Sequence, residues 1–438
     1  MKKVLSTVAA LGLIAGLAST ASAVEFKMSG KYLVEGAYIS DGNGNGLDLN
    51  ESAGASNHTD AYFLHTFEVK PTMKVNDKVS MSSVIRLADD SFWGSQGDTS
   101  TTPNNTNSVY IHQLYMDYAS PIGNMRFGRT PAGTYGTSFM DSDLRGDRVM
   151  LYPSFLADGP WSTLFYIQKS KDNNNALASV GTATASASDA DSTSYVARVY
   201  YKTDSLDSGL HYQYTNDMTT ATINDRKQQL TAYGKYKMDN YFVNAELNHY
   251  FGSKETDPTS SVDYDSWAGM LQVGAKVDAM TPSLTYFYAQ GQDRTSTDIE
   301  NALGTTGTGD QFEPLYILTG RHTGMLNNDI FNAHTATLST AGVHAIVAAA
   351  DYAVSNQLTL HGAIGWAKAD QPETAAYTNR DDAYGWEYNV GAAYKLLDNL
   401  TYEAHFGYLA TGDYFKSNSA TDDTQNIYIL THSLTMSF

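Results

Sequence analysis

Asp41, Asn43 and Asn45 alternate with glycines near the start of the chain. Carboxylate and amide oxygens at alternate positions, with glycine at the turn, suit a Ca²⁺ ion. A complete twelve-residue calcium loop would carry its bidentate acid at position 52, where this sequence has a serine, and the nearest acid is Glu51. The segment is therefore either a calcium site or a flexible glycine loop, and we expect no other cofactor.

Other reactive residue types are missing or scattered. The chain has no cysteine, which excludes disulfides, thiolate zinc sites and a cysteine nucleophile. Its 11 histidines form no HExxH pair, and no G-x-S-x-G elbow or phosphate-binding glycine loop occurs. With 47 acidic against 28 basic residues, the protein would repel nucleic acid. We therefore predict neither an enzyme nor a nucleic-acid partner.

Residues 1–23 have the composition of a secretory signal peptide. Lys2 and Lys3 precede an uncharged apolar stretch from Val4 to Leu17, and small residues follow up to Ala23. A transmembrane anchor is the alternative, although the apolar run is short and is interrupted by serine, threonine and glycine. We expect cleavage after Ala23, which leaves 24–438 as a single domain.

Alternating polar and apolar residues fill the rest of the chain. Every second residue from Phe26 to Tyr38 is apolar or small, and most residues between them are charged or polar. The same alternation recurs at 61–69 and 384–394. Each of these segments predicts a β-strand with one apolar and one polar face. The helical period of 3.6 residues is missing, so we predict an all-β protein.

The links between these strands alternate in length. Short links such as Asn76-Asp77 and Ser355-Asn356 separate nine long ones, which are rich in Gly, Asn, Asp, Ser and Thr and cover 40–60, 89–108, 130–147, 171–193, 217–228, 254–265, 293–333, 370–383 and 412–425. This pattern is typical of a transmembrane antiparallel β-barrel with short periplasmic turns and long extracellular loops. The links predict about 18 strands, and Pro153 leaves 16 as the alternative.

The charges and the two strand faces support this arrangement. The nine long loops hold 32 acids and 9 bases, a net charge of −23, whereas the strands and short turns of 24–438 sum to +2. The apolar faces must meet lipid, because hydrocarbon accepts no unsatisfied polar group. The opposite faces imply a water-filled lumen, because so many ionisable groups cannot line a dry core. Their members are Arg86, Arg126, Arg148, Arg198, Lys235, Lys276, Glu68, Asp117, Glu246, Glu387, Glu403 and His405.

Two segments resemble general bacterial outer-membrane porins. Residues 120–136, SPIGNMRFGRTPAGTYG, are similar to the porin signature of a tight turn, a strand ending in Gly128-Arg129 and a loop that folds into the channel. The last strand, from Ile427 to the terminal Phe438, is similar to the signal that the barrel-assembly machinery recognises. The similarity of sequence motifs is limited to these two segments, whereas the similarity of strand and loop arrangement covers residues 24–438.

The resemblance implies a trimeric porin of the Gram-negative outer membrane, which passively admits ions and small hydrophilic solutes. It also implies that 130–147 is the constriction loop, with Asp141, Asp143 and Asp147 opposite the pore-wall residues Arg86, Arg126, Arg148 and Arg198. Arg129 is in phase with Met125 and Phe127 rather than with Arg126, so we expect it to end the strand or anchor the loop.

Ions entering the channel must cross the acidic rim, so we predict a moderate cation preference that weakens as salt increases. The acidic loops also suit cation-bridged contact with lipopolysaccharide, next to the lipid bilayer. Two alternatives stay open: a structural or adhesin barrel without an open channel, and a substrate-specific porin for sugars or organic acids. The second is suggested by inward tyrosines at Tyr115, Tyr152, Tyr166 and Tyr200. Whether 293–333 occludes the entrance stays open too.

Overall fold

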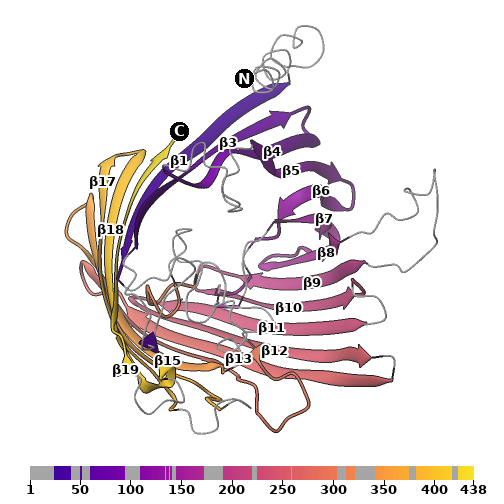
Figure 1. The fold of residues 1–438 in the computed structure, drawn as a ribbon. Helices are drawn as coiled ribbons and strands as arrows, with labels where there is room; N and C mark the ends of the chain where they lie inside the picture. The colour runs from indigo at the N-terminus through magenta and orange to yellow at the C-terminus, as the bar shows by residue number, and fades with distance from the viewer. Residues whose placement is uncertain are drawn as a thin grey trace.

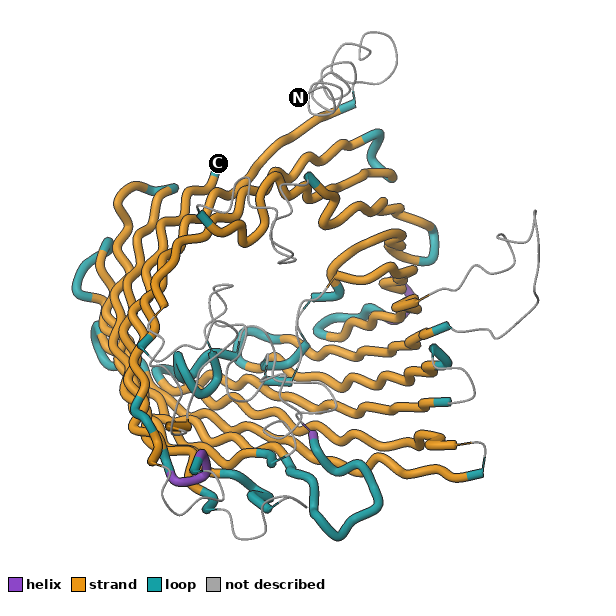
Figure 2. The backbone as a smooth tube through the Cα atoms, in the orientation of Figure 1, coloured by secondary structure: helices purple, strands orange, loops and turns teal. Residues whose placement is uncertain are grey.

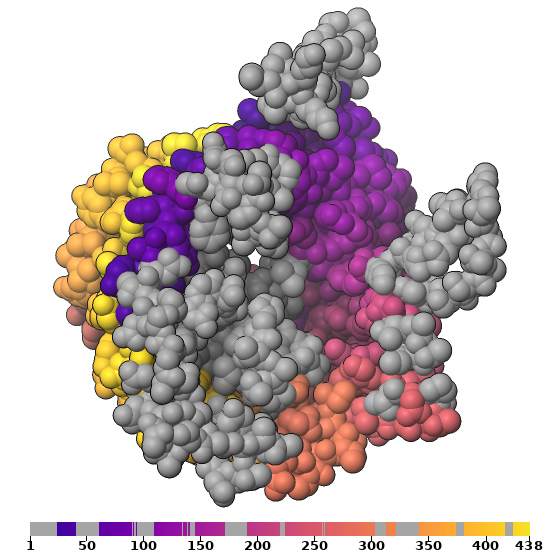
Figure 3. Space-filling model, viewed as in Figure 1, coloured from indigo at the N-terminus to yellow at the C-terminus, as the bar shows by residue number. Residues whose placement is uncertain are grey.

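The computed structural model describes residues 24–40, 50–51, 60–93, 109–133, 135–137, 139–140, 145–171, 191–219, 224–257, 259–302, 312–320, 341–373, 381–416 and 423–438. In these ranges, 18 strands form one antiparallel sheet. The sheet closes because β1 (Glu25–Ile39) pairs with both β3 (Asp60–Lys74) and β20 (Ile427–Ser437). The indigo first strands accordingly lie beside the yellow last strands (Figures 1 and 3). The predicted barrel and its 18 strands are confirmed.

Each of the remaining barrel strands pairs with its neighbours in sequence. They are β4 (Val79–Phe92), β5 (Tyr110–Ser120), β6 (Gly123–Pro131), β7 (Arg145–Pro153), β8 (Trp161–Lys171), β9 (Ser192–Lys202), β10 (Leu206–Asp217), β11 (Asp225–Met238), β12 (Tyr241–Asp257), β13 (Ser260–Ala275), β14 (Met280–Ala289), β15 (Val343–Ala353), β16 (Leu358–Lys368), β17 (Ala383–Leu397) and β18 (Leu400–Thr411). A separate small sheet joins β2 (Asn50–Glu51) to β19 (Asp423–Thr424), and two 3₁₀ turns are η1 (Ser154–Leu156) and η2 (Asp413–Phe415).

One predicted long loop is wrong. Only residues 258 and 259 separate β12 from β13, whereas the sequence predicted a long loop at 254–265. The ladder between the two strands continues up to the pairing of Asp257 with Ser260. Polar residues there extend the strands because strand pairing depends on backbone groups, which every residue except proline supplies in full.

Side chains alternate between the two faces of the barrel. On β13, Trp267 and Leu271 point outward and are 41% and 48% exposed, whereas Ala268 and Met270 point inward and are 0% and 7% exposed. This period of two follows from the pleat of a β-strand. The outer surface is therefore apolar, as the sequence predicted.

Among the residues that the structure describes, we find no helix with the length and apolarity of a membrane span.

The apolar core lies inside the barrel rather than between two layers. Its buried members include Phe139 and Phe312 from loops, together with Phe287 and Val347 from the inner wall. Figure 2 shows loop segments, in teal, inside the ring of strands. The inner wall is therefore partly covered by inserted chain.

Candidate functional site: an inner wall with two inserted segments

The loop between β6 and β7 enters the barrel. β6 ends at Pro131 and β7 begins at Arg145, so the loop is shorter at both ends than the predicted 130–147. Among its described residues, Tyr135, Phe139 and Met140 are buried. Burial of three large side chains from a connecting segment requires that it pack against the inner wall.

Glu246 of β12 holds this loop by its backbone. The buried carboxylate accepts the N–H of Thr137 at 2.7 Å and that of Met140 at 3.3 Å, and the Thr137 hydroxyl also donates to it at 2.7 Å. Asn248 donates to the same group at 2.9 Å. Gly136 allows the close approach, since a Cβ there would collide with the carboxylate. A buried carboxylate needs such donors, and here the loop supplies most of them.

Arg198 of β9 holds the start of the same loop. Its guanidinium donates to the carbonyl oxygens of Ala132 at 3.1 Å and Gly133 at 2.9 Å, and to Nδ1 of His211 at 3.0 Å. The ring of Tyr135 lies with its centroid 5.1 Å from the guanidinium carbon. Arg198 therefore positions the loop rather than facing open lumen.

A second inserted segment, 312–320, belongs to the connection between β14 and β15. Glu387 of β17 is fully buried and accepts the N–H groups of Ile317 at 2.8 Å and Leu318 at 2.7 Å. Asn389 donates to Glu387 at 2.7 Å and accepts the N–H of Tyr316 at 3.2 Å. A wall carboxylate again binds loop amides, so both inserted segments are docked by the same chemistry.

The two inserted segments touch each other. The rings of Phe139 and Phe312 lie edge to face with centroids 4.9 Å apart, and Phe287 of β14 lies 6.0 Å from the first and 5.0 Å from the second. Residues 312–320 of the predicted loop 293–333 are thus inside the barrel, and residues 303–311 and 321–340 are outside the described residues. The contact joins two connections far apart in sequence.

The predicted pore-wall arginines fall into two groups. Arg148 and Arg198 are 7% and 2% exposed, and Arg148 donates to the Thr130 carbonyl and, at 2.8 Å, to Gln168. Their guanidinium groups therefore support the backbone near the loop, because a buried cation needs such acceptors. By contrast, the side chains of Arg86 and Arg126 keep 23% and 24% exposure. These two remain the candidates for contact with solute.

Several inward tyrosines pack against arginines instead of forming an open track. The guanidinium of Arg126 lies 4.3 Å from the ring centroid of Tyr115, and that of Arg148 lies 5.4 Å from the ring of Tyr166. Such cation–π contacts fix the orientation of the charge. Asp117 fixes Arg126 further through two hydrogen bonds of 2.7 and 3.2 Å.

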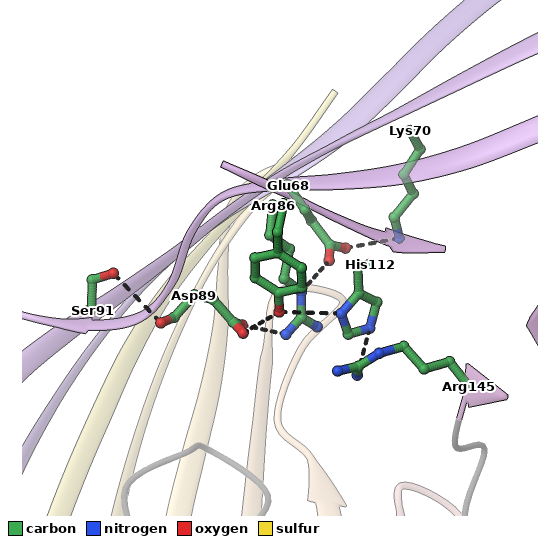
Figure 4. Close-up of polar contacts among 8 residues, drawn as sticks. Glu68, Lys70, Arg86, Asp89, Ser91, His112 and Arg145 are labelled. Atoms are coloured by element: carbon green, nitrogen blue, oxygen red, sulfur yellow. Dashed lines mark hydrogen bonds and ion pairs between the residues drawn. The ribbon is translucent and has the colours of Figure 1, made fainter. Parts of the chain in front are cut away.

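A polar network occupies the inner wall across β3, β4, β5 and β7 (Figure 4). Glu68 binds Lys70 at 2.9 Å and Arg86 at 3.4 Å, and Asp89 also pairs with Arg86. His112 lies 3.3 Å from Arg145 through its Nε2. A guanidinium can only donate, so this Nε2 accepts and His112 is neutral. The network therefore combines three cations with two carboxylates.

Two of the three predicted loop acids, Asp141 and Asp143, are outside the described residues. The third, Asp147, is not in the loop, and that prediction is wrong. It lies on β7 in phase with the outward Val149, and it forms two hydrogen bonds of 3.0 and 2.9 Å with Arg129. The strand begins at Arg145, earlier than predicted, which moves Asp147 onto the outer face.

The backbone conformation explains why the porin-like motif has a glycine at position 128. Gly128 has a φ of +124°, a region that glycine alone enters readily, and a Cβ there would collide with the Leu114 carbonyl oxygen. Arg129 follows it on the outward face, so it does not line the lumen, as predicted from its phase.

The terminal residue sits at the seam of the barrel. Phe438 accepts the N–H of Gly30 at 2.8 Å and donates its own N–H to the Gly30 carbonyl at 3.1 Å. Its ring lies over Gly30, where a Cβ would collide with it, and near Phe67 with centroids 6.4 Å apart. Recognition of this strand by the assembly machinery stays a prediction.

The calcium candidates Asp41, Asn43 and Asn45 are outside the described residues. Within the described ranges, no group of three or more His, Asp or Glu side chains is placed to hold a metal ion.

Sequence reasoning missed the roles of Glu246 and Glu387. Alternation placed both on the inner face, but it gave no sign that each would bind backbone amides of an inserted segment. A usable signal exists for Glu246, because Asn248 stands two residues later on the same face, and Asn389 stands likewise after Glu387. This E-x-N pattern supplies the carboxylate with one side-chain donor from its own strand.

No protein-family model matches the sequence, and no curated protein matches it significantly. Solved structures do match. A BenF-like porin from Pseudomonas fluorescens has a TM-score of 0.52 at 12% identity, covering 94% of this chain and 99% of that one. Pseudomonas aeruginosa OpdO has a TM-score of 0.53 at 11% identity, covering 94% and 97%. OccK1 (OpdK) of the same organism has 0.53 at 11%, covering 94% and 99%.

Identities this low establish the fold and leave the substrate open. The matches cover nearly the whole chain, which itself forms one closed barrel of 18 strands. The chain therefore has the fold of Gram-negative outer-membrane porins.

Proposed function

We propose that the protein is an outer-membrane porin that lets ions and small hydrophilic solutes diffuse passively through a water-filled channel. The proposal is supported by one observation above all: ionisable side chains line a closed barrel whose outer face is apolar. The long connections would face the outside of the cell and the short turns the periplasm. The loop between β6 and β7 and the segment 312–320 would narrow the passage.

The ion preference would be moderately cationic in dilute salt. The segments predicted as long loops carry a net charge of −23, to which the strand ends within 254–265 contribute four acids and one base. The screening length falls from roughly 30 Å at 0.01 M to about 3 Å at 1 M. The rim would therefore act across the mouth of the channel in dilute salt and lose most of its influence in concentrated salt.

Planar-bilayer recording of the purified protein tests both statements. We expect discrete conductance steps in potassium chloride, and a reversal potential under a salt gradient that favours potassium and shrinks as both concentrations rise. Protein that inserts as heat-modifiable barrels without any conductance steps would refute the channel and favour a structural or adhesin barrel. Anion selectivity in dilute salt would refute the cation preference.

A substrate-specific porin for organic acids is the second candidate, and the network of Figure 4 favours it. Lys70, Arg86 and Arg145 outnumber Glu68 and Asp89 on this part of the inner wall. Cations positioned on a lumen wall attract carboxylates. Liposome swelling with small organic acids that exceeds swelling with neutral solutes of equal size would support this candidate over general diffusion.

The remaining expectations follow from the same proposal. The protein would reside in the outer membrane as a homotrimer, contact lipopolysaccharide there, and be inserted by the barrel-assembly machinery. Light scattering of the detergent-solubilised protein measures the oligomeric state, and membrane fractionation measures the location.

A further inference from the structure

The outer wall carries a groove over β7, β8, β9 and β10. It has a volume of about 440 Å³, and it is lined by outward apolar side chains that include Val149, Phe165, Ile167 and Tyr195. The four strands contribute two adjacent rows in register: Val149, Ile167 and Tyr195 form one, and the other is Leu151, Phe165, Ala197 and Tyr212.

A size mismatch explains the groove. Ala197 faces outward between two large cross-strand neighbours, Phe165 of β8 and Tyr212 of β10. Tyr195 stands two residues before it on the same face. Directly opposed side chains in a sheet lie close enough to touch, so one alanine among aromatic rings leaves a hollow with apolar walls.

A row of charged residues borders the groove on the side of the long connections. Arg129, Asp147 and Lys169 lie directly opposite one another on neighbouring strands and form one row. Along its own strand, each is two residues away from the nearer apolar row, so it points outward as that row does. Arg129 pairs with Asp147, and Lys169 pairs with Asp191 at 2.6 Å. The side chains of Arg129 and Lys169 remain 50% and 43% exposed.

Both cations keep exposed surface beside their carboxylate partners, where another anion can approach them. Arg129 and Asp147 are both about half exposed, and such a salt bridge contributes little to stability, so an incoming phosphate can replace Asp147 at small cost. Asp191 is only 15% exposed, so at Lys169 the phosphate would share the cation with this carboxylate rather than replace it. Arginine and lysine are the side chains that bind phosphate best, arginine through two parallel hydrogen bonds. The cations therefore complement a phosphate held at the end of the groove.

We propose that this surface binds one phosphorylated lipid of the outer leaflet, with an acyl chain in the groove over Ala197 and a headgroup phosphate at Arg129 and Lys169. The inference rests on the proposed function, since the outer wall must face a membrane. Apolar chain and charged headgroup follow one another along the barrel axis in the order that a lipid presents them. The acidic neighbours Asp147 and Asp191 restrict the site to headgroups with strong anionic charge.

Native mass spectrometry of the detergent-purified protein tests the proposal, with bisphosphorylated lipid A and its dephosphorylated form as probes. We expect one retained lipid A per chain, and at least fivefold less of the dephosphorylated form. Arg129→Gln with Lys169→Gln should reduce retention of lipid A about tenfold. Ala197→Trp, which fills the groove, should do the same, and Ala197→Leu serves if the tryptophan variant fails to fold.

Lys368→Gln is the matched control, because Lys368 forms an outward ion pair with Asp382 at 2.8 Å on another part of the barrel. It should retain lipid A as the wild type does. Equal retention of both lipids, or equal losses in control and test variants, would overturn the proposal. The proposal would also be overturned if Ala197→Trp retained lipid A unchanged while an oligomer of the protein dissociated. That result would assign the groove to contact with a second copy of the chain.

The porin proposal is tested separately by the same variants. Arg129 and Lys169 point away from the lumen, so their double variant should keep wild-type conductance. Loss of lipid retention with normal conductance supports the lipid site. Normal conductance without any wild-type retention would refute the lipid site and leave the channel standing.

Discussion

Arg198 and Glu246 both bind the backbone of the loop between β6 and β7, Arg198 as a hydrogen-bond donor and Glu246 as an acceptor. The guanidinium of Arg198 donates to two carbonyl groups at residues 132 and 133, and the carboxylate of Glu246 accepts from the amides of residues 137 and 140. The two residues stand on β9 and β12, so the loop is held at two points of the wall. A loop held at two points of the wall would keep its position in the proposed channel.

Glu246→Ala should release the loop between β6 and β7. The substitution removes three hydrogen bonds to a charged acceptor, each worth about 1.5–3 kcal/mol, and leaves the loop amides without their partner. We expect a changed single-channel conductance and clearly greater open-channel noise in planar bilayers. Asp351→Asn, which removes an exposed inward carboxylate paired with His361, is the charge control and should leave the noise unchanged. Wild-type noise in Glu246→Ala would mean that the loop is held elsewhere.

Phe139→Ala and Phe312→Ala should both weaken the same contact between the two inserted segments. Edge-to-face aromatic pairs add about 0.5–1.5 kcal/mol beyond their burial, and this pair joins the two inserted segments. We expect each single variant to broaden the conductance distribution and the double variant to add little more. Phe406→Ala, on the outer face, is the control. Fully additive effects would show that the two segments move independently.

Asp141→Asn with Asp143→Asn should shift the reversal potential toward anions, because both acids are expected in the constriction. Asp147→Asn provides an internal comparison, since Asp147 pairs with Arg129 on the outer face and should leave the potential unchanged. Equal shifts in the double variant and in Asp147→Asn, or a shift in Asp147→Asn alone, would contradict this assignment.

Gly30→Val and deletion of Phe438 should both lower the amount of assembled barrel. A side chain at Gly30 would collide with the Phe438 ring and with the Glu68 carbonyl oxygen, so it disturbs the seam between β1 and β20. Heat-modifiable migration in membrane fractions measures assembly. Gly234→Val is the control, because a Cβ at Gly234 meets no atom within 4 Å. Normal barrel levels in Gly30→Val would argue against a role for this contact.

Barrel and strand count could be predicted because the period of two is a local property that every strand repeats. The segment around Pro153 illustrates this, since β7 ends at that residue and the count of 18 holds. Errors arose where polar residues continue a strand. Asp147, Asp257 and Ser260 are paired in the sheet although the segments around them have the composition of loops.

The inserted segments could be predicted only in part. Asp, Gly and Thr in 130–147 suggested a loop, but no local pattern tells which wall carboxylate meets which loop amide. Glu246 and Thr137 are separated by 109 residues, and Glu387 and Leu318 by 69. Such contacts between a wall carboxylate and a loop amide form only in the closed barrel, which brings strands and loops that are distant in sequence next to one another.

The manner in which 312–320 is docked affects how its sequence can change. Glu387 binds the backbone N–H groups of Ile317 and Leu318, and every amino acid except proline carries such a group. Exchange of either side chain therefore leaves both hydrogen bonds available. If the protein is the proposed porin, the side chains that 312–320 presents to solutes can therefore change, through evolution or by deliberate engineering, while the backbone hydrogen bonds that dock the segment are kept.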